Sequence, residues 1–557
     1  LIKFTLSNYS DDIIFNESDG AVNYNALKFG QYDNGWVNDS YIRCYEGVRQ
    51  ASIMINNVDI NEELTKEEIL DKKAQARFLR AYFYWLLLRR YGPVPLIPDE
   101  TISIDETYIG MSCPRATYDE VVDYIDKEMI LAANDLPDRR DRQNIARATK
   151  GAALAVRAKV LLYSASPLNN PLPNDPDKFT DFVDDQGRIL MSQTYDESKW
   201  ARAAAAAKDV INLGRYELHI ADYQDKGDNT YPATVKPPYN AKYSTKNFPD
   251  GWANIDPFES YRSIFNGDLY ANENEELIFT RGNNSLADQV NYLVRNQMPT
   301  FAGGENRHGL TAKQCDAYDM ANGDAFNLQH FLDTCDASKR FVTEDEYKAG
   351  KYPQLRPNVW KEYANREPRF YASVAFSGAF WPFASAKDAE YRNQQIWYYR
   401  GNKEGRKNGS DKWIPTGIGM MKFINPNDCN TNNGKIYDKV DVAIRYADIL
   451  LMYAEALNEL TPGNSYEVTN WQGETMVVSE MSKAVSRVRI RAGMPDYEQE
   501  VYNDQTLFRK KLMHERQVEF MGENQRYHDL RRWKNVAIEE SEQIYGCNVL
   551  MTEATKE

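Results

Sequence analysis

The chain has few histidines and lacks the common catalytic motifs. Its 557 residues contain five histidines, and no two of them stand at the spacing of a metal-ligand pair. It also contains no Walker-type phosphate loop, no GxGxxG pattern after a strand, no HExxH and no GxSxG. The sequence therefore points to no catalytic site, metal or cofactor.

Cysteine is also sparse, and its spacing excludes two structural classes. There are six cysteines without a CxxC pair, so neither a zinc site nor a disulfide scaffold is indicated. We expect each to be a free, buried thiol. They are Cys44, Cys113, Cys315, Cys335, Cys429 and Cys547.

Long apolar runs are missing as well. No stretch approaches the roughly 20 apolar residues that a membrane-spanning helix needs. The densest run, 81–88, is flanked by Arg80 and Arg89, which is typical of a buried helix. Hydrophobic residues make up 42% and charged residues 27%, as in an ordinary globular protein. The chain starts at Leu1 without a signal-like segment, so we expect a trimmed or mature product.

The charge balance argues against nucleic acid as a partner. Lys and Arg number 67 against 82 Asp and Glu, and the net charge of −15 would repel a phosphate backbone. The two basic clusters, 139–142 and 531–534, are short and lie among acidic residues. We interpret both clusters as solvated helix faces.

Apolar residues recur at helical spacing in several segments. Gly92 and Pro93 end the first of them, and Thr149 stands before the second. The second and third are rich in alanine, which lets two helices approach closely and favours stacked helical hairpins. The predicted helices are 74–91, 148–164, 200–213, 446–460, 480–492 and 505–521.

Between about 220 and 440 the helical periodicity fades and Tyr, Trp, Asn, Gly and Pro become frequent. Such a long irregular segment usually carries function. We expect a mainly α protein with a helical-hairpin scaffold, an α-α superhelix, and a large loop-rich ligand-binding insert. The predicted division is 1–230 for the first part of the scaffold, 231–440 for the insert and 441–557 for the completing helices.

Several motifs resemble those of the SusD/RagB family. The strings RFLRAYFYW at 77–85 and RYADILLMYAEALN at 445–458 carry much of the resemblance. Glu367 is a mild departure, because the family pattern has Asp before this proline. Further matching segments are 91–96, 148–153, 164–170, 316–323, 366–374, 487–495, 514–520 and 526–533.

This resemblance implies both a fold and a cellular role. It implies tetratricopeptide-like helix pairs carrying an irregular ligand-binding subdomain. It also implies a signal peptide and a lipidated cysteine before Leu1, and thus a surface-exposed position on the outer membrane. The implied partners are a glycan and a SusC-like TonB-dependent transporter. Members that capture peptides leave peptide or another nutrient as an alternative ligand.

The charged residues within the matching helical motifs predict structure, not catalysis. They lie on apolar helices, where charges are tolerated only when they are paired. We expect an interior ion-pair network that joins the last helices. Its predicted members are Arg445, Asp448, Glu455, Glu515, Arg516 and Arg526.

A glycan site needs flat aromatic rings beside short polar groups, and four stretches have this composition. Trp36 and Trp381 are the favoured platforms, because Trp36 follows Gly35 and Trp381 follows a Gly-Ala step, contexts suited to exposure. The predicted ligand-binding residues are Tyr32, Asp33, Asn34, Trp36, Trp252, Tyr261, Phe301, Asn306, Arg307, Trp381, Trp397 and Tyr399. For any single Trp, packing beneath its own loop is the competing interpretation.

Three other interpretations stay open. Asp175, Asp177, Asp181, Asp184 and Asp185 cluster in one loop but lack the order and glycine of an EF-hand, so we expect a solvated acidic loop without calcium. The chain has so many carboxylates that a pair with the separation needed by a glycosidase can be imagined at many places. The carboxylates therefore do not distinguish a glycan-processing enzyme from a binding protein. A purely structural tetratricopeptide adaptor would contact protein through the insert.

Overall fold

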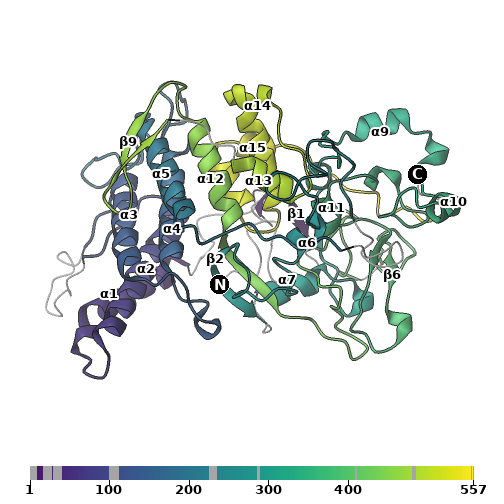
Figure 1. Ribbon diagram of the computed structural model, residues 1–557, viewed down its shortest axis with the longest axis horizontal. Coiled ribbons are helices and arrows are strands. Elements are labelled where there is room, and N and C mark those ends of the chain that lie inside the picture. The colour runs from purple at the N-terminus through teal and green to yellow at the C-terminus, as the bar shows by residue number, and fades with distance from the viewer. Residues whose placement is uncertain are drawn as a thin grey trace.

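The computed structural model describes residues 9–16, 28, 30, 40–98, 112–224, 235–284, 289–407, 410–479, 484–553 and 555. Long helices gather on one side of the molecule and short elements around α9, α10 and β6 on the other, with α12 to α15 between them (Figure 1). The long helices are α1 (Ser40–Asn57), α2 (Lys66–Tyr91), α3 (Tyr118–Asp135), α4 (Lys150–Ala165), α5 (Ser198–Asn212) and α12 (Tyr446–Asn458). The later helices are α13 (Ala484–Arg491), α14 (Gln499–Asn503), α15 (Gln505–Glu519), α16 (Arg526–Arg532) and α17 (Val536–Glu539).

The six predicted helices are all present, and their ends follow local chemistry. The hydroxyl of Thr65 accepts from the backbone of Glu68, whose carboxylate accepts from Thr65 in return, so a capping box starts α2. Gly92, at a φ of +69°, ends it. Thr149 caps α4 as its place in the sequence indicated. No predicted range covers α1 or α3.

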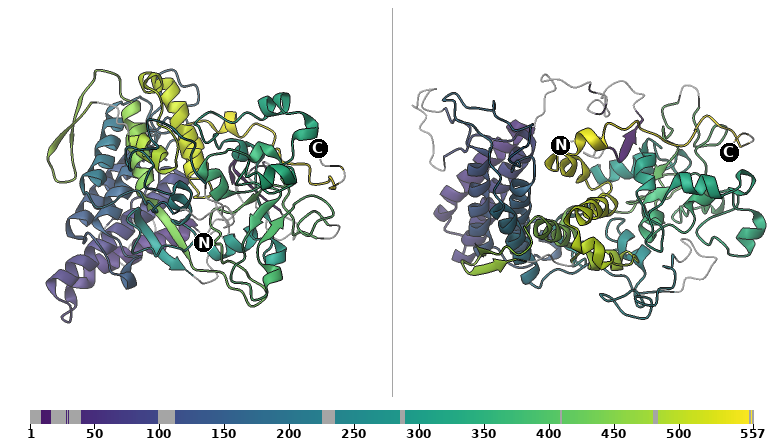
Figure 2. Two further views of the ribbon diagram at one scale, coloured as in Figure 1. Left: turned by 45° about the vertical axis from the view of Figure 1, so that its right-hand side comes forward. Right: turned by 90° about the horizontal axis from the view of Figure 1, so that it is seen from above.

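Successive helices pack against one another as hairpins. α1 contacts α2, α2 contacts α3, α3 contacts α4, and α4 contacts α5, which in turn contacts α12. Figure 2 shows these helices side by side, seen from above in its right-hand view. Every residue of α4 after Lys150 is buried, and the alanines of α5 give it a narrow face. Small side chains on both helices therefore allow the close stacking that the sequence predicted.

The insert contains short elements only. Among the described residues between 235 and 445, no helix exceeds the nine residues of α7. Its helices are α6 (Pro257–Arg262), α7 (Gln289–Gln297), α8 (Ala312–Asp316), α9 (Leu328–Thr334), α10 (Glu344–Lys348) and α11 (Pro368–Ser373). Single 3-10 turns are η4 (Thr300–Ala302), η5 (Ala337–Lys339), η6 (Lys361–Tyr363) and η7 (Ala389–Tyr391) here, and η2 (Val58–Ile60) and η3 (Arg142–Asn144) in the scaffold.

In the described part of the chain, four small antiparallel sheets complete the fold. The largest has the order β1-β3-β7-β4 and brings the early strand β1 (Ile13–Phe15) against β3 (His308–Leu310), beside β7 (Gly419–Met420) and β4 (Val374–Ala375). β2 (Leu277–Asn284) pairs with β8 (Lys439–Arg445) in a two-stranded ribbon that places Leu277 opposite Arg445. The other pairs are β5 (Ala379–Trp381) with β6 (Gln394–Ile396), and β9 (Tyr466–Thr469) with β10 (Thr475–Val478).

Two large hydrophobic clusters divide the interior. One is built almost wholly from the long helices, and the other almost wholly from the insert together with Ile13. The predicted boundaries at 230 and 440 stay a prediction. The described cysteines are all free, but Cys113, Cys335 and Cys547 are only half-buried, so the expected burial is wrong for these three. No helix among the described residues is long and apolar enough to cross a bilayer.

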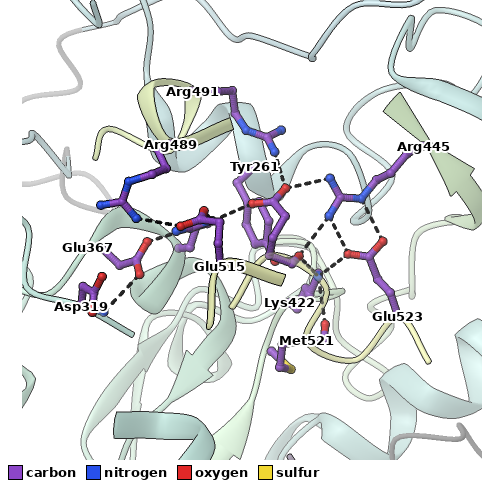
Figure 3. Close-up of polar contacts among 12 residues, drawn as sticks. Tyr261, Asp319, Glu367, Lys422, Arg445, Arg489, Arg491, Glu515, Met521 and Glu523 are labelled. Atoms are coloured by element: carbon purple, nitrogen blue, oxygen red, sulfur yellow. Dashed lines mark hydrogen bonds and ion pairs between the residues drawn. The ribbon is translucent and has the colours of Figure 1, made fainter. Parts of the chain in front are cut away.

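Buried ion pairs join the last helices, as the charged motifs predicted, and others link these helices to residues of the insert. Arg445, at the end of β8, donates to Glu276, Glu519 and Glu523, and all four side chains are buried. Arg445 and Lys422 both reach Glu523 in Figure 3, where Glu515 bonds to Arg489. The other predicted members are also paired, in Arg516–Asp448, Arg532–Glu455, Arg369–Glu515 and Arg526–Asp11.

Candidate ligand-binding site

The N-terminal candidates cannot be placed. Tyr32, Asp33, Asn34 and Trp36 lie outside the described residues, so their role in binding stays a prediction. The other eight predicted residues are described, and they fall into three groups.

Trp381 is wholly buried, so the expectation that it is an exposed platform is wrong. It lies on β5, where alternate side chains point to opposite faces, and it shares the inward face with Ala379. Its ring stacks on Phe383 at 5.7 Å between centroids within the core of the insert. The outward residue of this strand is Phe380, which lies under the guanidinium of Arg356.

Trp252 and Tyr261 are also packing residues. Trp252 stacks on Tyr243 at 5.0 Å, in a small separate cluster. Tyr261 is fully buried among the ion pairs of Figure 3 and donates its hydroxyl to the backbone oxygen of Glu519. Neither offers a ring face to a ligand, so their burial contradicts the prediction that they bind one.

Phe301, Asn306 and Arg307 lie together on the loop that follows α7. Phe301 is half-buried, with Tyr391 stacked at 5.3 Å and the ammonium of Lys403 at 4.3 Å from its ring centre. Asn306 is buried at a φ of +50° and donates to the backbone oxygen of Glu404. Arg307 forms an ion pair with Asp411. These contacts hold the loop against Glu404 and Asp411.

Trp397 and Tyr399 line a hollow of about 300 Å³, here named the tryptophan pocket. The rings of Trp397 and Tyr399 are 5.5 Å apart, and Trp360 stacks on Phe341 at 6.2 Å on another part of the wall. Trp360 and Trp397 are both partly exposed. Other lining residues include Asp316, Glu362, Tyr363, Asn358, Ser377 and Asn548.

Local backbone geometry places the two indoles. β6 ends at Ile396, and Trp397 follows it directly, above the turn at Gly378. Gly378 has a φ of +91°, which favours glycine, so the Gly-Ala step makes room for Trp397 and does not expose Trp381. The indole N–H of Trp360 is buried and has no hydrogen-bond partner among the described residues. A ligand hydroxyl could accept from this donor.

Two carboxyl groups in the pocket hold their protons unusually tightly. Burial, together with the smaller effect of the nearby Asp316, raises the pKa of Glu362 to about 7. Burial likewise raises the pKa of Asp316 to about 6. The Cys547 thiol, with a pKa raised to about 12 by burial, stays uncharged. A partly protonated carboxyl group can both donate and accept, which suits the hydroxyl groups of a sugar.

Sequence reasoning missed most of this pocket. Asn358 and Trp360 stand close together in the sequence, the same combination that nominated Trp36, so this signal was available. Asp316 and Glu362 carry no comparable signal in the sequence. The wall formed by 546–551 could not be found, because it reaches the pocket through backbone bonds such as Arg400 N to Val549 O at 3.1 Å.

The described residues hold no group of His, Cys, Asp and Glu side chains arranged for a metal ion. In the acidic loop, Asp175 pairs with Lys534 at 2.6 Å and Asp184 accepts from Arg188 at 3.0 Å. These two carboxylates of the loop therefore have protein partners.

The fold and the pocket together define a ligand-binding protein built on stacked helix pairs. A family model described as "SusD family" matches residues 263–556, which is more than half of the chain. A second model, described as "Starch-binding associating with outer membrane", matches residues 4–162. The chain belongs to the SusD family.

Individual relatives agree with this assignment. SusD-like protein P25 of Formosa agariphila is 23% identical over 506 residues, covering 89% of this chain and 70% of that protein. The crystal structure of a SusD-like protein from Bacteroides fragilis has a TM-score of 0.67 and 22% identity, covering 97% of this chain and 84% of that one. A crystal structure with xylogluco-oligosaccharide has a TM-score of 0.53 and 18% identity, covering 95% of this chain and 77% of that one. The predictions of family and fold class are confirmed.

Proposed function

We propose that this protein captures an oligosaccharide or polysaccharide in the tryptophan pocket and delivers it to a SusC-like TonB-dependent outer-membrane transporter. The observation that carries the proposal is the pair of partly exposed indoles, Trp360 and Trp397, beside the buried carboxyl group of Glu362. The C–H face of a sugar ring packs on an indole, while its hydroxyl groups need nearby donors and acceptors.

The comparisons support the ligand class. One family model is described as starch-binding, and one structural relative was crystallised with xylogluco-oligosaccharide. The same description links the family to the outer membrane. A lipid anchor upstream of Leu1, exposure at the cell surface and the SusC-like partner belong to the proposal.

The test is isothermal titration of the purified protein with a xylogluco-oligosaccharide and a malto-oligosaccharide. We expect Trp360→Ala and Trp397→Ala each to weaken binding by roughly 1 to 4 kcal/mol, as for a central aromatic anchor. Trp471→Ala is the matched control, because Trp471 is also partly exposed but lies beside the β9–β10 hairpin. Unchanged affinity in both pocket variants would reject this pocket as the glycan site.

Peptide capture on the same scaffold is the competing proposal. An extended peptide pairs with an exposed strand edge or a charged groove, and its affinity would depend little on two indoles. Binding of a mixed peptide library with no binding of either oligosaccharide would favour the peptide. Delivery is tested separately, by co-purification of the transporter from outer membranes with the lipidated full-length protein.

A further inference from the structure

A second and larger hollow lies in the helical scaffold, at the ends of α2 and α4 and beside α16. Its volume is about 500 Å³, within the usual range of small-molecule sites. It shares no lining residue with the tryptophan pocket. We name it the cationic pocket, after the residues Arg89, Arg90, Arg531, Arg532 and Lys534 that line it.

The lining is strongly positive although the chain carries a net charge of −15. Five Arg and Lys side chains line the cationic pocket, and no Asp or Glu of the described residues does. The sequence interpretation of 531–534 as a solvated face is wrong in part, since Arg532 and Trp533 are buried. Part of the basic cluster 531–534 therefore points into the protein at this pocket.

Only some of these cations are neutralised by the protein. Arg532 pairs with the buried Glu455 and Asp529, and Lys534 pairs with Asp175. In the described part of the chain, neither Arg89 nor Arg90 has a carboxylate within ion-pair distance, and Arg90 donates to the hydroxyl of Ser40.

Arg531 has only a long ion-pair contact within the described part of the protein. It lies over the ring of Tyr527 at 3.5 Å, and its carboxylate contact, to Glu540, is as long as 3.8 Å. Other arginines of the scaffold are paired closely, such as Arg157 with Asp209 at 2.7 Å. Arg89 and Arg90 therefore face the hollow without a carboxylate partner among the described residues, and Arg531 has one only at 3.8 Å.

A buried histidine gives an independent indication of a ligand. His528 lines the cationic pocket with only 7% of its surface exposed, and its Nε2 atom has no hydrogen-bond partner among the described residues. Buried polar atoms are normally satisfied by protein, water or ligand. Burial and the adjacent Arg89 keep the pKa of His528 well below its usual range, so the ring is neutral until an anion offsets those charges.

The walls show what kind of anion fits. Phe179 and Phe182 supply accessible ring surfaces above the buried rings of Tyr118 and Tyr163, and Phe179 and Arg90 are exposed at the rim. An acidic sugar combines C–H faces for these rings with a charged group that Arg side chains can clamp. We propose that the cationic pocket binds a sugar that carries an acid group, as a carboxylate or as a sulfate ester.

This site is independent of the proposed function, and calorimetry can test it directly. Glucuronic acid and glucose 6-sulfate should bind at least about tenfold more tightly than glucose, since charge-assisted hydrogen bonds are worth roughly 1.5 kcal/mol or more. The affinity should fall as NaCl is added. Arg89→Gln and Arg531→Gln should each weaken acid binding by about fivefold or more.

Two control variants locate the binding. Arg139→Gln removes a cation that pairs with Glu275 on the surface, and it should leave the affinity unchanged. Trp471→Ala alters a partly exposed indole outside both pockets and should also leave the affinity for glucuronic acid unchanged. The proposal would be overturned if the acids bound no more tightly than glucose, or if Arg89→Gln bound the acids as tightly as the wild type. Inorganic sulfate binding as tightly as glucose 6-sulfate would overturn the assignment to a sugar.

NMR spectroscopy of the wild-type protein tests the proposal even if an arginine variant fails to fold. The imidazole signals of the wild-type protein can be assigned with His528→Asn. Saturation with glucuronic acid should shift the His528 signals and raise its pKa, while the signals of His330, on α9, stay in place. Unmoved His528 signals at saturating acid would contradict binding in this pocket.

Discussion

Gly378 lies directly against the indole of Trp397, and a Cβ at this glycine would come to 2.8 Å from the ring. Its φ of +91° also disfavours any other residue. We predict that Gly378→Ala costs roughly 1 to 3 kcal/mol of unfolding free energy and weakens glycan binding, because the indole must move. Urea unfolding and calorimetry measure the two effects.

Gly401→Ala separates the effect of backbone strain at a positive φ from the effect of moving the Trp397 indole. Gly401 has a similar φ of +95°, but nothing lies within 4 Å of the Cβ position. Its variant should therefore lose stability and keep the affinity for the oligosaccharide. An equal loss of affinity in both variants would show that Trp397 is not the affected group.

Trp381→Ala should act on stability. Its ring fills the core of the insert, and truncation of a buried Trp costs about 3 to 5 kcal/mol. Chemical denaturation should show this loss, whereas Trp397→Ala should unfold close to the wild type, because its ring is partly exposed. A fully stable Trp381→Ala variant would contradict the buried position.

Glu519→Gln tests the ion pairs between the two clusters. Glu519 accepts from Arg369, Arg445 and Arg491 while fully buried, so its removal leaves cations without their counter-charge. We expect a loss of about 3 to 5 kcal/mol in unfolding free energy. The exposed pair Arg139–Glu275 is the control, and Glu275→Gln should cost at most about 1 kcal/mol. Similar costs for the two variants would argue against the network's role.

Stability should depend on pH through Glu362. Its pKa is raised from 4.5 to about 7 by burial, so the folded protein holds this proton more tightly than the unfolded chain. The resulting stabilisation is complete below pH 4.5 and is lost as the pH rises through about 7. Asp316 acts in the same direction, with its pKa at about 6.

We therefore expect the unfolding free energy of the wild type to fall over this pH interval more steeply than that of Glu362→Gln. Urea unfolding at several pH values from about 5 to 8 measures the difference. Glu390→Gln, at an exposed position of the insert, should follow the wild type. Parallel curves for Glu362→Gln and the wild type would contradict the raised pKa.

Most of the scaffold, although not α1 or α3, could be predicted because its signals are local. Helical periodicity, the Thr149 cap and the Gly92 stop all act within a few residues, and buried charges such as Arg445 must find partners. The tryptophan pocket could not be predicted, because Asp316, Trp360, Trp397 and Asn548 meet only in three dimensions. Trp381 shows the limit most clearly, since its exposure depends on which face of a three-residue strand it occupies.

The wall of the tryptophan pocket formed by 546–551 has a consequence for biosynthesis. A ribosome makes these residues after every scaffold helix has been translated, and Cys547 then bonds to the backbone of Thr416. The pocket therefore reaches its final shape only after residues 546–551 have been translated. A chain truncated before residue 546 would contain every described scaffold helix and lack this wall of the recess, so a stop codon there would leave the pocket incomplete.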